Sequence, residues 1–136
     1  MTGKSFKKAR PSVDEWLREA RTDPAAAKVG MFLVHNGVVR QTPKAQVRQG
    51  LDDGSSVKSM EFTYNAEKVD RAISDTYKMD GIFYVRAWLN EGRLELGEDI
   101  MYVLIGGDIR PHVVDALQFL VGKIKTECVT EIEHKD

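Results

Sequence analysis

Three basic side chains stand where an ordered element is expected to begin or end. Arg40 closes an apolar, β-branched run, and Arg110 follows the glycine turn Gly106-Gly107-Asp108. Lys125 lies in the last turn of a helical pattern. Guanidinium and ammonium groups bind phosphate and carboxylate, and a helix start such as that at Arg110 adds free N–H groups. We therefore expect a cationic site that binds an anion.

Each of these cations also has an ordinary structural explanation. Arginine is common on protein surfaces, so Arg40 could simply cap the end of a strand. A strand, a glycine turn and a helix around Arg110 form an everyday connection. The helix dipole favours a lysine at position 125, or at its weaker rival Lys123, whatever the function. Lys44, in the loop after Arg40, is expected to be solvated.

The remaining reactive side chains do not suggest a second chemistry. Cys128 is the single cysteine and stands beside Glu127, which indicates a buried structural thiol rather than a nucleophile. His35, His112 and His134 have no metal-ligand spacing with one another or with Cys128. We expect neither a metal nor a cofactor.

The composition is that of one globular domain. Of 136 residues, 42% are hydrophobic and 30% are charged, and 20 basic residues against 21 acidic ones leave a net charge of −1. No global field favours nucleic acid or a membrane surface, and no apolar run approaches the roughly 18 residues of a spanning helix. A single cysteine is typical of a reducing, cytoplasmic location. We expect a flexible basic arm over residues 1–10 and one domain over 11–136.

Periodicity and capping residues predict how these side chains are positioned. The predicted helices run from Ser12 to about Arg21, from Ala66 to Lys78 after the cap Asn65, and from Arg110 to Lys125. The predicted strands are Lys28–Arg40, interrupted at Asn36-Gly37, then Val57–Tyr64, Ile82–Leu89, a short piece Leu94–Leu96, Asp99–Ile105, and an edge strand Cys128–Glu133. A long loop is expected at Gln41–Ser56. This order predicts an α+β fold, a mostly antiparallel sheet with helices packed on one face.

Two segments of this pattern resemble the catalytic large subunit of molybdopterin synthase, a MoaE-like family. One is Asn36-Gly37-Val38-Val39-Arg40. The other is Leu94-Glu95-Leu96-Gly97-Glu98-Asp99-Ile100, followed by a strand, a turn carrying Arg110 and a helix with Gln118-Phe119. With the elements between them, the resemblance covers about residues 29–127 and implies the α/β hammerhead fold.

The resemblance also implies a reaction. Enzymes of that family transfer sulfur from the thiocarboxylate of a small ubiquitin-like partner ending in Gly-Gly to cyclic pyranopterin monophosphate, forming the dithiolene of molybdopterin. It implies Lys125 as the catalytic residue, with Arg40 and Arg110 holding phosphate or carboxylate. The alternatives are a non-catalytic relative that binds a pterin-like anion or a ubiquitin-like tail, and a generic α+β dimer with a regulatory role.

The sequence departs from the family pattern at several positions. Ile109 stands where a histidine is expected before Arg110, and Trp88-Leu89 replaces a basic pair. The segment Glu131-Ile132-Glu133-His134 lacks the expected second active-site lysine. Either His112, which we count among the substrate-binding candidates, or Lys135 could compensate.

Helix geometry sets a further condition. Arg110 and Lys125 are fifteen residues apart, which on one helix separates them by roughly 22 Å at about 1.5 Å per residue. They cannot share a pocket within one chain. We therefore predict a homodimer in which Arg110 of one chain approaches Lys125 and Arg40 of the other.

Overall fold

A computed structural model describes residues 8–44, 47, 50 and 54–135. The helices are α1 (Val13–Ala20), α3 (Ala66–Tyr77) and α4 (Arg110–Lys123), with a 3-10 turn η2 (Ala26–Lys28) and a π-helical turn η3 (Ile124–Cys128). The strands are β1 (Met31–Val38), β2 (Val57–Tyr64), β3 (Ile82–Leu89), β4 (Gly92–Glu95), β5 (Asp99–Gly107) and β6 (Val129–Lys135). The predicted α+β class is confirmed. Most of the predicted arm, and parts of the predicted loop, lie outside the described residues.

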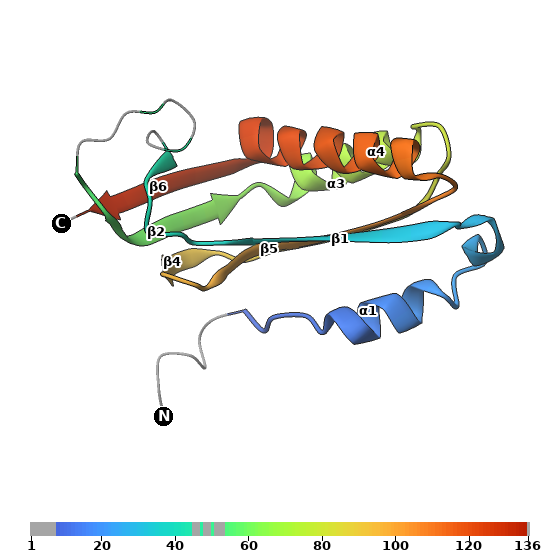
Figure 1. Cartoon of the computed structure of the whole chain (residues 1–136), viewed down its shortest axis with the longest axis horizontal. Helices are drawn as coiled ribbons and strands as arrows, with labels where there is room; N and C mark the ends of the chain where they lie inside the picture. Colours follow the sequence, from blue (N-terminus) through green and yellow to red (C-terminus); the bar gives the residue numbers. More distant parts are fainter. Residues whose placement is uncertain (1–7, 45–46, 48–49, 51–53, 136) are drawn as a thin grey trace.

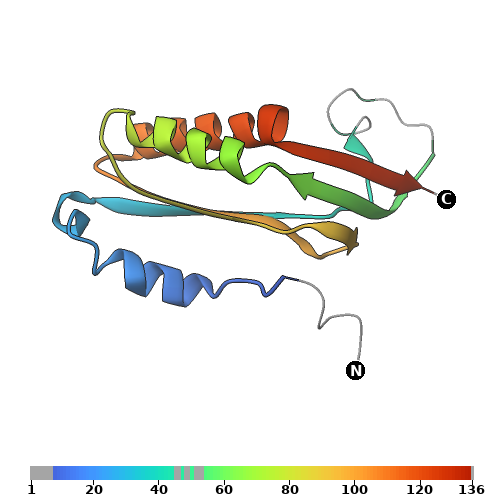
Figure 2. The same ribbon diagram turned by 180° about the vertical axis from the view of Figure 1, so that it is seen from behind.

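The strands form two antiparallel sheets, with strand orders β1-β5-β3 and β4-β2-β6. Helices α3 and α4 lie over one face of the first sheet, and α1 runs along its opposite face (Figures 1 and 2). Within the described residues, no helix is long and apolar enough to cross a membrane.

Strand β5 explains why both faces of its sheet are covered. Every residue from Ile100 to Gly107 is buried, so an apolar side chain points to each face in turn. Met101, Val103 and Ile105 belong to the main core with α3 and α4. Tyr102 and Leu104 pack with Trp16 and Ala20 of α1. The sequence analysis placed helices on one face only, and the double burial of β5 is what brings α1 to the other face.

The predicted capping residues and strand interruption are confirmed. The Ser12 hydroxyl accepts a hydrogen bond from the Glu15 amide (3.3 Å), and the Asn65 side chain accepts one from the Lys68 amide (3.0 Å). The register of β1 against β5 shifts after Gly37, where the sequence predicted an interruption. This bulge changes the direction of the strand just before the segment that carries Arg40.

The last helix ends two residues earlier than predicted. Helix α4 ends at Lys123, and a π-helical turn then carries Lys125 before β6 begins at Val129. The Thr126 hydroxyl donates to the Gly122 carbonyl (2.8 Å) and satisfies one acceptor near the helix end. Isolated π turns occur frequently at functional sites, and here the turn sets the direction in which Lys125 projects.

One glycine position gives a stability prediction. Gly81 has a φ of +74°, and a Cβ built on it would lie 2.2 Å from Asp108 Oδ1. Gly81→Ala is therefore expected to lower the free energy of unfolding by roughly 3 kcal/mol, from backbone strain plus the clash. Gly97→Ala, at φ +81° in open space, should cost only about 1 kcal/mol. Urea denaturation measures the free energy of unfolding of both variants. An equal loss in Gly81→Ala and Gly97→Ala would show that the contact with Asp108 is unimportant.

Candidate functional site

A pocket of about 320 Å³ lies where the two sheets meet. Its lining residues come from β1 and the segment that follows it, from β2, β5 and β6, and from α4 and η3. Both Arg40 and Lys125 are among them. Met60, Ile100 and Val121 add apolar surface, while charged groups supply the polar lining. The structure therefore brings together two of the predicted site residues from distant parts of the sequence.

Backbone hydrogen bonds hold the segment that delivers Arg40. The Val39 amide donates to the Glu98 carbonyl (3.0 Å), and the Gly97 amide donates to the Val39 carbonyl (2.8 Å). The Val39 side chain is buried in the main core. Arg40 itself is exposed, so its guanidinium can reach both the pocket and solvent.

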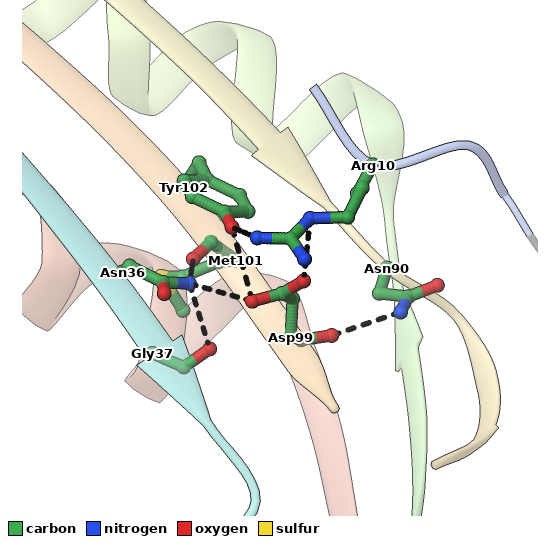
Figure 3. A network of polar contacts seen from close by, with 7 residues as sticks. All are labelled: Arg10, Asn36, Gly37, Asn90, Asp99, Met101 and Tyr102. Atoms are coloured by element: carbon green, nitrogen blue, oxygen red, sulfur yellow. Dashed lines mark hydrogen bonds and ion pairs between the residues drawn. The ribbon is translucent and has the colours of Figure 1, made fainter. Parts of the chain in front are cut away.

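A polar network beside the β1 bulge stiffens the same corner (Figure 3). Asp99 accepts hydrogen bonds from the Asn36 amide (3.1 Å) and the Tyr102 hydroxyl (3.1 Å), and it pairs with Arg10 Nε (3.3 Å). Arg10 also donates to the Tyr102 hydroxyl (2.6 Å), while Asn90 donates to the Asp99 carbonyl (2.8 Å). Arg10, predicted to belong to a loose arm, thus ties the segment before α1 to β5, while Asn36 links β5 to β1.

Lys125 makes an ion pair inside the pocket that the sequence analysis did not anticipate. Its Nζ lies 3.7 Å from Glu131 Oε1, and Lys44 Nζ lies 3.3 Å from Glu131 Oε2. The Glu131 side chain is only 4% exposed. Lys44 was predicted to be solvated, but its ammonium group is drawn to this buried carboxylate. The alternation of β6 could have placed Glu131 and Glu133 on the same face as Val129, but it could not have identified the two lysine partners.

His35 completes the pocket and gives a pH-dependent prediction. Burial, and then the nearby positive charge of Lys125, lower the pKa of His35 below its usual 6.5. As the pH falls through 6.5, the unfolded chain binds a proton that the folded chain resists, so stability is lost toward acid. We expect a steeper loss between about pH 7.5 and 5.5 in the wild type than in His35→Gln. Chemical denaturation across this range checks it, and parallel curves would contradict it.

Arg110 and His112 lie at the opposite end of α4 and do not line this pocket. His112 Nδ1 is 2.7 Å from Asp108 Oδ1, which also accepts from the Ile109 amide (2.6 Å). These contacts, the one with His112 foremost, lower the pKa of Asp108. Arg110 and Lys125 are therefore at opposite ends of α4 within one chain, as predicted. The contact with the Asp108 carboxylate fixes the orientation of the His112 ring.

The remaining candidates lie outside the pocket. Ile132, at the position of the absent lysine, lines a depression with Glu61 and Arg93, and Lys135 is exposed at the end of β6. Cys128 is a buried free thiol whose pKa is raised, mainly by burial. This agrees with the structural role expected for it.

The fold and the pocket define the class: an antiparallel α+β protein with a charged pocket at the junction of two sheets. A model of the MoaE protein family matches residues 6–127, so the chain belongs to this family, as its resemblance indicated. No curated protein matches the chain by sequence.

Several solved structures share the fold of this chain. Molybdopterin synthase from Staphylococcus aureus superposes with a TM-score of 0.70 at 16% identity, covering 93% of this chain and 88% of that one. The MoaE protein from Burkholderia ambifaria superposes with a TM-score of 0.68 at 17% sequence identity, covering 94% of this chain and 85% of that one. A chain in a complex of subunits 1 and 2 of molybdopterin-converting factor from Helicobacter pylori superposes with a TM-score of 0.62 at 12% sequence identity, covering 90% of this chain and 78% of that one. At these identities the likeness establishes the fold alone.

Proposed function

We propose that the chain works in molybdenum cofactor biosynthesis as a homologue of the molybdopterin synthase large subunit. In this role it transfers sulfur from a thiocarboxylated ubiquitin-like partner to cyclic pyranopterin monophosphate. Membership of the MoaE family supports the biosynthetic role. The observation that carries the proposal is the presence of Arg40 and Lys125 in one pocket, although 84 residues lie between them in the sequence.

The pocket residues divide the chemistry between them. Arg40 offers a planar fork of N–H donors to a phosphate or carboxylate. Lys125 places an ammonium group where it can stabilise charge that develops on a thiocarboxylate oxygen, or bind an acyl or pterin group transiently. The apolar side chains of Met60, Ile100 and Val121 exclude water around the reacting groups and so strengthen these interactions.

The proposal includes two protein partners. One is the small ubiquitin-like subunit, whose Gly-Gly tail would enter the pocket. The Helicobacter pylori structure is a complex of subunits 1 and 2 of molybdopterin-converting factor. The other is a second copy of this chain. Since Arg110 and His112 lie at the end of α4 away from Lys125, a two-fold pair would let them complete the pocket of the partner.

A direct reconstitution tests the function. The chain is incubated with a thiocarboxylated small subunit and cyclic pyranopterin monophosphate, and dithiolene formation is followed by mass spectrometry. Product formation that requires all three components supports sulfur transfer. Absence of product with a partner that is shown to bind would contradict it.

A second candidate function is that of a non-catalytic relative that binds the tail or a pterin-like anion. The pairing of Lys125 with Glu131 favours it, because an ammonium group held by a carboxylate is a poorer nucleophile than a neutral amine. Binding of the small subunit without turnover in the same reconstitution would select this candidate.

A further inference from the structure

The pocket contains its own anions. One oxygen of Glu131 lies 3.3 Å from Lys44 Nζ, and the other lies 3.7 Å from Lys125 Nζ. The carboxylate therefore bridges two ammonium groups, as the carboxylate or phosphate of a ligand would. Glu133 contributes a second carboxylate, which accepts a hydrogen bond from the backbone amide of Lys44 (3.2 Å).

These carboxylates change the net charge of the pocket. Its lining includes three permanent cations, Arg40, Lys44 and Lys125, and two carboxylates, Glu131 and Glu133. The sum is one positive charge, because the remaining titratable group, His35, is neutral near pH 7 when its pKa lies below 6.5. Without Glu131 the sum would be two.

Charge matching favours a particular class of ligand. A single negative charge neutralises the pocket, whereas a dianion leaves one negative charge uncompensated in a partly buried place and costs more to desolvate. Carboxylates, thiocarboxylates and cyclic phosphodiesters carry one charge. Phosphate monoesters carry close to two at pH 8.

We propose that Glu131 determines the charge specificity of this pocket, so that it accepts ligands with a single negative charge and discriminates against phosphate monoester dianions. Glu131 acts by neutralising one of the two ammonium charges between which it lies, so that the guanidinium of Arg40 supplies much of the charge that binds the ligand while Lys125 stays within reach of the reacting group. The inference rests on the proposed function for the location of the site. It extends that function by naming the charge class of both substrates, a tail thiocarboxylate and a cyclic phosphate.

Two small probes test the inference without partner or pterin. N-acetylglycylglycine supplies a carboxylate monoanion, and phenyl phosphate supplies a dianion at pH 8. Each is titrated into the full chain, and dissociation constants are taken from amide chemical shifts of pocket residues. The wild type should bind the carboxylate more tightly. In Glu131→Gln, the preference for the monoanion should fall by about tenfold or reverse, since one charge has been removed from between the lysines.

Two further variants serve as controls for the effect of the Glu131 charge on ligand preference. Glu127→Gln removes a glutamate from the neighbouring turn, where its side chain is 56% exposed and outside the pocket, and should keep the wild-type preference. Glu131→Asp keeps the charge and should do the same. Thermal melting confirms that each variant is folded.

Several results would overturn the inference. One is an unchanged preference in Glu131→Gln, another is an equal change in Glu127→Gln, and a third is no binding of either probe to the wild type. Failure of sulfur transfer in the reconstitution is a separate result. It would remove the proposed reaction while leaving the measured charge preference in place.

Discussion

Replacing Lys125 by alanine is expected to lower dithiolene formation at least about 100-fold, the loss typical when a preorganised charge at a reacting centre is removed. The reason is its position: the ammonium group lies in the pocket with Arg40, and its side chain is only 26% exposed. The variant should still bind the small subunit, because most single side chains of an interface cost less than about 1 kcal/mol when they are truncated, and lysine is not among the residue types enriched at hot spots. Product is measured by mass spectrometry, and partner binding by calorimetry.

Lys123 provides the matched control for this prediction. It lies two residues earlier, at the end of α4, but its ammonium group pairs with Glu127 (3.0 Å) and lies over the ring of Phe119, away from the pocket. Lys123→Ala removes the same charge and should retain activity within about twofold, as surface substitutions usually do. Equal losses in the two variants would assign the effect to general electrostatics and argue against a role for Lys125 in the reaction.

The sequence predicted most elements of the fold because local patterns determine them. Alternation identified β2, and the caps Ser12 and Asn65 marked two helix starts. The division into two sheets could not be predicted, because alternation shows which residues share a face and not which strands pair. The π turn after Lys123 was missed for a related reason, since it follows from packing at the end of α4 and has no residue signature.

The site was predicted in part for the same physical reasons. Arg40 and Lys125 were found because arginine and lysine at element ends are a recognisable pattern, supported by the family resemblance. Glu131 was noted only as a departure, since no local pattern shows that a strand residue will lie between two lysines from other segments. Arg10 was assigned to solvent because its partner Asp99 lies 89 residues further along the chain.

Mixing two inactive chains is expected to restore activity if the site is shared between copies. In a heterodimer of Arg110→Ala and Lys125→Ala chains, one pocket has the intact Lys125 of the first chain and the intact Arg110 of the second. Each mixed dimer has one complete site out of two, so about half of wild-type activity should return in purified mixed dimers. The basis is the length of α4, whose 14 residues separate Arg110 from the pocket by roughly 20 Å within one chain.

A second mixture decides whether this recovery reflects a composite site. Arg40 and Lys125 line the same pocket of one chain, so a heterodimer of Arg40→Ala and Lys125→Ala chains contains no complete site and should stay inactive. Mixed dimers are verified by purification through two different tags before activity is measured. Recovery in both mixtures, or in neither, would contradict the arrangement, because only a pocket completed by the Arg110 of a second copy distinguishes them.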